Sequence, residues 1–152
     1  MPAKMNSPDP KTGTLSAVGE KLNIDAELLP FFKEEAAEIF TNLEKTLVAW
    51  EANPGDKTAT KTIYRMFHTL KGSANSIGLS PIGRLSHSME QIMKSVSEER
   101  SHPSPHALVP AIRTISTGLQ ILLQELSPDS CCPRLFAELE SKVGVIRNGL
   151  LP

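Results

Sequence analysis

The sequence has few aromatic residues, no long apolar run and little net charge, and each shortage excludes a class of protein. Aromatic residues make up 5% of the 152 residues, too few for platforms that stack nucleic-acid bases. The formal net charge of -1 lacks the basic excess typical of nucleic-acid binding. No run of about 18 or more apolar residues is present, which excludes a membrane-spanning helix. We therefore expect neither nucleic-acid binding nor membrane insertion.

Cysteine is also scarce, and the two cysteines, Cys131 and Cys132, are adjacent. Two neighbouring sulfurs cannot form a disulfide framework or a four-ligand zinc site. We interpret them as reduced thiols, with a vicinal redox pair as the alternative. The N-terminus lacks the charged-then-apolar pattern of a secretory signal. Together these features predict a cytoplasmic protein.

The length suits one domain with a single core. Residues 1–23 are rich in Pro, Gly, Ser, Thr and Lys and show no apolar period, which predicts a flexible N-terminal tail. Residues 24–150 are expected to form the folded domain. No stretch alternates apolar and polar residues as a half-buried strand does, so we expect helices throughout this domain.

Apolar residues recur at steps of three and four in five segments, which predicts five amphipathic helices. The first is expected to begin near Asp25, a plausible N-cap, and to end at the breaker Asn53-Pro54-Gly55. The second runs from about residue 57 to 77, where Gly78 is a natural terminator.

The last three helices follow similar signals. Ser80-Pro81 is predicted to provide the N-cap and first residue of the third helix, and Ser104-Pro105 to start the fourth. Pro110 is either the true start of that helix or a kink. The apolar positions of the fifth helix are Leu135, Leu139, Val143 and Ile146. Five amphipathic helices with short connections predict an all-α antiparallel bundle.

The second predicted helix carries an outward-facing histidine. At about 100° per residue, His68 falls well off the apolar stripe of the helix. Lys71 lies one turn beyond His68, on the flank of the helix, and Gly72 lies on the same outward half as His68. A glycine inside a helix costs about 1 kcal/mol relative to alanine. Folding gives no reason to place Gly72 on the solvent face, whereas a partner that must approach His68 does.

These residue types suit a phosphoryl acceptor. Neutral imidazole is a nucleophile near neutral pH, because its ordinary pKa is about 6.5. A nearby cation such as Lys71 can offset the charge of a phosphoryl group. An acceptor should hold the other ring nitrogen of His68, and Glu90 on the third helix is the candidate. His87 and Glu90 are three residues apart, so they share a helix face.

Two sequence runs resemble a known family. The run His68-Thr-Leu-Lys71-Gly72-Ser73-Ala74, followed by Gly78, resembles the signature of histidine-phosphotransfer (HPt) domains. The run Leu85-Ser-His87-Ser-Met-Glu90 resembles the matching helix in the phosphoacceptor domain of chemotaxis-type histidine kinases. The separation between the two runs also fits that subgroup, and the resemblance covers roughly residues 25 to 149.

The resemblance implies a role for each matched residue. His68 would be phosphorylated on its outer ring nitrogen, and Glu90 would accept a hydrogen bond from the other. Lys71 would stand near the phosphoryl group, Gly72 would give a partner room to approach, and His87 would have a supporting role. The fold would be an HPt-like four-helix bundle core with an additional fifth helix.

The resemblance also implies partners. A histidine kinase catalytic domain would phosphorylate His68, and the aspartate of a response-regulator receiver domain would take the phosphoryl group. The chain would then be a phosphocarrier without its own catalytic domain, cofactor or metal, and a monomer in isolation. An apolar docking patch is expected near His68, including Ile77 or Leu79.

Two alternatives stay open at this point. The chain could be a degenerate HPt-like scaffold, a helical interaction domain with no phosphate chemistry. It could also hold a metal ion through His68, His87 and Glu90.

Overall fold

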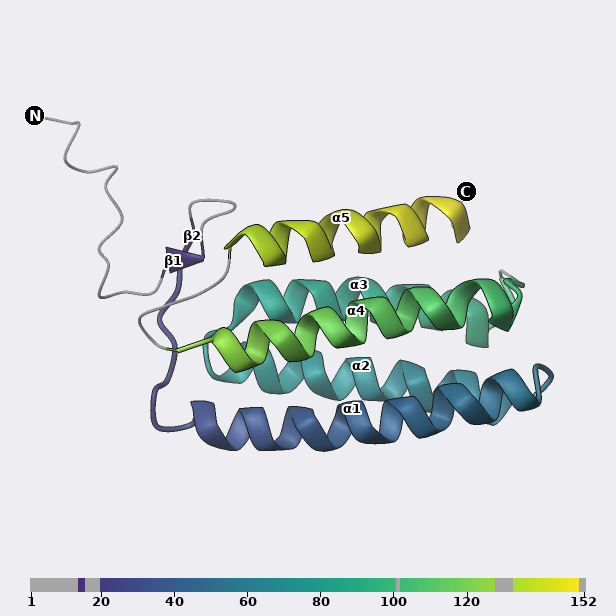
Figure 1. Ribbon diagram of the computed structural model, residues 1–152, viewed down its shortest axis with the longest axis horizontal. Helices are drawn as coiled ribbons and strands as arrows, with labels where there is room; N and C mark the ends of the chain where they lie inside the picture. The colour runs from purple at the N-terminus through teal and green to yellow at the C-terminus, as the bar shows by residue number, and fades with distance from the viewer. Residues whose placement is uncertain (1–13, 16–19, 101, 128–132, 151–152) are drawn as a thin grey trace, which may run out of the picture.

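The computed structural model describes residues 14–15, 20–100, 102–127 and 133–150, and helices dominate them. The helices are α1 (Leu29–Ala52), α2 (Lys57–Ser76), α3 (Ser80–Ser97), α4 (Pro105–Glu125) and α5 (Pro133–Leu150). Consecutive helices run in opposite directions, and α1 to α4 lie alongside one another (Figure 1). The predicted all-α antiparallel bundle is therefore confirmed.

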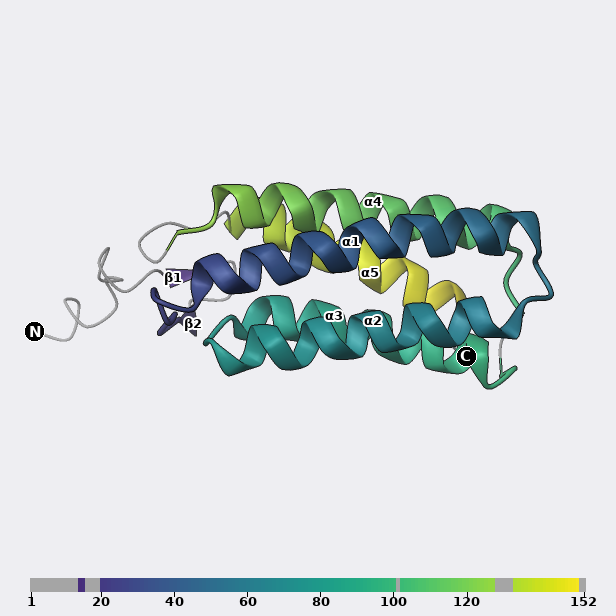
Figure 2. The same ribbon diagram turned by 90° about the horizontal axis from the view of Figure 1, so that it is seen from below.

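The fifth helix packs on the outside of the four-helix core. It contacts α3 and α4 and crosses them at an angle (Figure 2). Gly118 of α4 lets it come close, because a Cβ atom built there would lie 2.3 Å from Leu139 Cδ2. On α5 itself, the side chains of Phe136, Leu139 and Val143 are buried. Phe136 is absent from the predicted apolar positions of this helix, although its side chain is fully enclosed.

The turn between α2 and α3 depends on Gly78. Its φ of 88° lies in the left-handed region that glycine adopts without steric cost. A Cβ atom at this position would also lie only 2.2 Å from the backbone oxygen of Asn23. The Leu79 N–H donates to the Ala74 carbonyl, and the fully buried Leu79 then points into the core. This tight turn sets α2 and α3 antiparallel and in close contact along their length.

Two predicted helix starts are wrong. Helix α1 begins at Leu29, and the Asp25 carboxylate instead accepts the N–H groups of Glu27 and Leu28 in a turn before the helix. Ser80 is already helical, and the capping position before it is Leu79, which makes no side-chain cap. In both places, packing of the preceding segment determines where the helix starts.

Helix α4 begins where the Ser104-Pro105 signal predicted. The Ser104 hydroxyl accepts the His106 N–H as an N-cap, and the helix begins at Pro105 and contains Pro110 in its interior. Pro110 is therefore not the start of the helix.

A short β pairing precedes the bundle and was not predicted. Strands β1 (Thr14–Leu15) and β2 (Glu20–Lys21) are antiparallel, with Thr14 opposite Lys21. Leu22, just beyond them, is buried. The flexibility predicted for residues 1–23 stays a prediction, and Cys131 and Cys132 lie outside the described residues. Within the described part of the chain, no helix is long and apolar enough to cross a membrane.

Candidate functional site

The antiparallel pairing of α2 and α3 brings His68 opposite Glu90. The distance between His68 Nδ1 and Glu90 Oε1 is 2.5 Å. The His68 side chain is 60% exposed, whereas that of Glu90 is 4% exposed. A carboxylate can only accept, so Nδ1 carries the proton, and in the neutral ring Nε2 keeps a free lone pair. The arrangement presents one defined nitrogen of an exposed imidazole to solvent.

The second oxygen of Glu90 is also engaged. Lys71 Nζ donates to Glu90 Oε2 at 2.7 Å, and His87 Nδ1 lies 3.3 Å from the same oxygen. Burial by itself raises the pKa of Glu90, but the hydrogen bonds from Lys71 and His68, the Lys71 charge and the weaker His87 contact outweigh it. They lower the pKa from 4.5 to about 2. Glu90 is therefore ionised at neutral pH, and it holds Lys71 beside the imidazole.

Gly72 leaves open space one turn beyond His68. A Cβ atom built on Gly72 would meet no heavy atom within 4 Å, so neither packing nor φ requires a glycine here. The next residue, Ser73, donates its hydroxyl hydrogen to Glu35 of α1. This bond ties α1 to α2 beside the opening.

The apolar surface near this opening differs from the one predicted. Ile77 and Leu79 are 5% and 0% exposed, so the prediction that they form a docking patch is wrong, because the turn at Gly78 folds them into the core. Two other residues are exposed, Leu28 at 45% and Phe31 at 69%. They line a shallow hollow at the start of α1, together with Ser73 and Ser76 of α2.

Sequence reasoning missed one neighbour of the histidine. The ring of Tyr64 lies 6.3 Å from the His68 ring, centroid to centroid, at an interplanar angle of 30°. The signal was available, because Tyr64 precedes His68 by four residues and such pairs meet on a helix surface.

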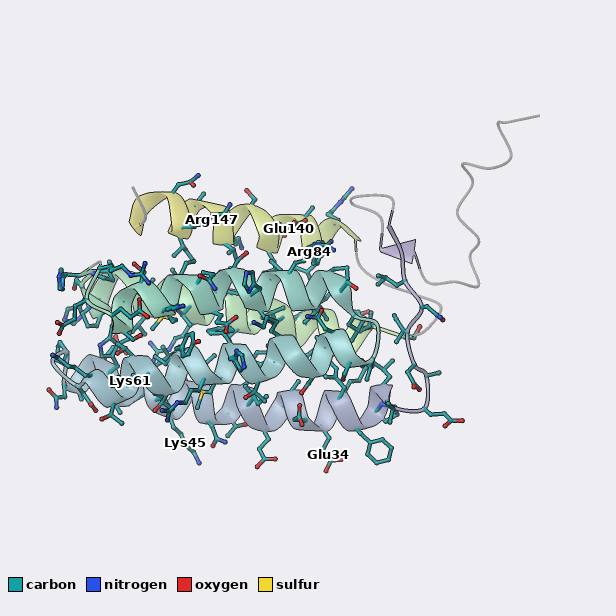
Figure 3. The ribbon with its side chains drawn as sticks, turned by 180° about the vertical axis from the view of Figure 1, so that it is seen from behind. Glu34, Lys45, Lys61, Arg84, Glu140 and Arg147 are labelled. Atoms are coloured by element: carbon teal, nitrogen blue, oxygen red, sulfur yellow. The ribbon has the colours of Figure 1, made fainter. Side chains whose placement is uncertain are left out.

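Charged side chains of both signs lie on the face formed by α1, α2 and α3 (Figure 3). Lys45 of α1 and Lys61 of α2 lie toward one end of this face, and Glu34 of α1 lies toward the other (Figure 3). The exposed pair Leu28 and Phe31 belongs to the same end as Glu34, since all three are at the start of α1.

The metal alternative finds no support in the described part of the chain. No group of three or more His, Cys, Asp or Glu residues there is arranged to hold a metal ion. Glu90, which the proposed metal set includes, accepts hydrogen bonds from the Lys71 ammonium and the His68 ring.

An exposed imidazole, fixed through one nitrogen by a buried carboxylate on the surface of a helical bundle, is the arrangement that the resemblance to histidine-phosphotransfer domains implies. Comparison with protein families agrees, since the model of the Hpt domain matches residues 27–129. The chain belongs to this family, whose members serve two-component signalling.

The curated proteins that are similar to this chain include chemotaxis and motility proteins. The chain is 29% identical over 99 residues to the chemotaxis protein CheA of Listeria monocytogenes, covering 65% of this chain and 16% of that protein. It is 30% identical over 97 residues to the sensor histidine kinase CheAY of Helicobacter pylori, covering 64% and 12%. A gliding motility regulatory protein of Myxococcus xanthus is 30% identical over 74 residues, covering 49% and 9%.

The matched region thus spans 16% or less of the length of these relatives. No solved structure gives a significant match to the chain.

Proposed function

We propose that this chain is a phosphocarrier that accepts a phosphoryl group on Nε2 of His68 and passes it to a receiver domain. The observation that supports this most directly is the 2.5 Å contact between His68 Nδ1 and Glu90 Oε1. It leaves Nε2 as the nitrogen that faces outward with a free lone pair. A surface histidine without a function would not require a buried, ionised carboxylate bound to its ring.

The chemistry follows from this arrangement. The Nε2 lone pair attacks the γ-phosphorus of ATP, the P–O bond to ADP breaks, and the phosphorylated ring keeps its Nδ1 proton. The ring is then cationic, and the negative Glu90 stabilises it. In the second step a receiver aspartate attacks the phosphorus, the P–N bond breaks, and the neutral imidazole returns. A kinase domain and the receiver would provide the nucleotide and the metal ion.

Lys71 and His87 have distinct parts in the proposal. Lys71, 24% exposed, stands next to the imidazole and reduces the repulsion that an incoming phosphoryl group would meet from Glu90. His87 makes only the longer contact of 3.3 Å to the carboxylate, so we assign it a supporting role in positioning Glu90.

The partners are proposed from the family and from the surface. We propose a chemotaxis-type kinase domain and a response-regulator receiver as partners, a cytoplasmic location where ATP is available, and a monomeric domain. Gly72 clears the approach to His68. The exposed Leu28 and Phe31 supply the apolar contact that protein interfaces contain at their centre.

Phosphorylation of the purified chain separates this function from a phosphate-free scaffold. Phosphoramidate, and separately ATP with a chemotaxis-type kinase core, would serve as donors, and intact mass would count the phosphoryl groups added. We expect one acid-labile, base-stable adduct on the wild-type chain and none on His68→Gln. His87→Gln is the matched control, since it removes the neighbouring histidine and should still accept. A well-folded wild-type chain that gains no phosphoryl group from either donor would favour the scaffold.

A further inference from the structure

The ring of Tyr64 stands against one side of the His68 imidazole. The centroid separation of 6.3 Å and the angle of 30° fall within the range at which aromatic rings attract each other. Tyr64 is itself partly buried, and its packing against the hydrophobic core restricts the movement of its ring. Helical side chains lean toward the N-terminal turn, which places the imidazole over Tyr64 and leaves open space on the side of Gly72.

We propose that Tyr64 is a positioning residue for His68, on the basis of the phosphocarrier function proposed above. The bond to Glu90 restrains the imidazole at Nδ1, next to the Cγ atom that joins the ring to the side chain. A ring restrained at these two adjacent atoms on a 60% exposed side chain can still tilt about the line between them. The anchored face of Tyr64 limits this tilt, so that Nε2 keeps one direction, toward the space that Gly72 leaves for the partner.

This positioning role requires the aromatic ring of Tyr64 and does not require its hydroxyl group.

The test compares Tyr64→Leu, which removes the ring, with Tyr64→Phe, which keeps it. Phe40→Leu is the control for lost aromatic burial, because Phe40 is 3% exposed in the core cluster and belongs to α1. At saturating phosphoramidate we expect Tyr64→Leu to be phosphorylated about two- to tenfold more slowly than wild type, with an unchanged KM. Tyr64→Phe and Phe40→Leu should both keep the wild-type rate.

A second measurement reads the position of the ring without any phosphotransfer. In the NMR spectrum of the unphosphorylated chain, the His68 Nδ1–H signal should exchange with water faster in Tyr64→Leu than in wild type, Tyr64→Phe or Phe40→Leu. Failure of the wild-type chain to accept phosphate would overturn the proposed function but not this readout. Wild-type exchange and a wild-type rate in Tyr64→Leu would overturn the proposal, and so would a Tyr64→Phe variant as slow as Tyr64→Leu.

Discussion

His68 and Glu90 are joined across the α2–α3 interface by a contact of 2.5 Å between Nδ1 and Oε1. One partner is a largely exposed imidazole and the other is a carboxylate with 4% of its side chain exposed. The pair therefore connects the solvent face of α2 to the inside of the bundle. The tight turn at Gly78 makes the contact possible, because it returns the chain so that α3 lies directly along α2.

Glu90 should make the stability of the domain depend on pH. Its pKa is lowered to about 2 in the folded protein, so its contribution is present above the unfolded value near 4.5 and is lost as the pH falls toward 2. Such a shift corresponds to roughly 3 kcal/mol at neutral pH. Urea unfolding from neutral pH to about pH 3 should show this loss in wild type and a flatter profile in Glu90→Gln. Glu38→Gln, at an exposed position of α1, should keep the wild-type profile, and equal slopes in all three proteins would contradict the account.

Gly72 should prove unfavourable for folding and necessary for docking. Because a Cβ atom meets nothing there, Gly72→Ala should raise the free energy of unfolding by about 1 kcal/mol. Gly72→Gln should fold well and accept phosphate from phosphoramidate at the wild-type rate, but pass it to a receiver more slowly. Stopped-flow transfer from the phosphorylated chain measures this difference. Normal transfer from Gly72→Gln would mean that the glycine does not serve the approach of a partner.

Phe31 should contribute to receiver docking rather than to folding. A side chain that is 69% exposed adds little to stability, and surface changes of this kind usually alter it by about 0.5 kcal/mol or less. Phe31→Ser should thus unfold like wild type and bind a cognate receiver more weakly, as titration calorimetry would show. Val145→Ser is the control, since Val145 is equally exposed at 70% on α5. A receiver that loses no affinity for Phe31→Ser would place the docking surface elsewhere.

Gly118 should be needed for the fifth helix to pack. Gly118→Ala would bring a Cβ atom to 2.3 Å from Leu139 Cδ2 in a buried contact, and overpacking of this kind costs about 1 to 3 kcal/mol. Gly144→Ala on α5, where a Cβ atom meets nothing within 4 Å, should be neutral or stabilising. Denaturant unfolding of both variants checks the difference, and equal stability would show that α5 can shift without cost.

Much of the bundle could be predicted because it depends on local patterns. The spacing of apolar residues predicted the five helices. Asn53 and Gly78 marked where α1 and α2 end, and Ser104 marked where α4 begins, because these signals depend only on neighbouring residues. The predicted starts of α1 and α3 were wrong because long-range packing determines where these helices begin. Asp25 is bound to the Ile77 carbonyl through its backbone N–H, and Leu79 is drawn into the core.

The site shows the same division between local and long-range effects. His68, Lys71 and Gly72 share one helix, so spacing alone places them together. Glu90 binds both Lys71 and His68 because of the register between α2 and α3. The spacing of residues within one helix does not predict that register. Ile77 and Leu79 were expected outside, because the sequence does not show how sharply the chain turns at Gly78.

Identifying the phosphorylated atom tests the central claim most directly. The chain would be labelled with ¹⁵N at histidine, phosphorylated with phosphoramidate and studied by NMR at neutral to mildly basic pH, where phosphohistidine persists. The account predicts a single phosphoryl group on Nε2 of His68, with Nδ1 still protonated and bound to Glu90. A phosphoryl group on Nδ1 of His68, or on His87 or another residue, would contradict it.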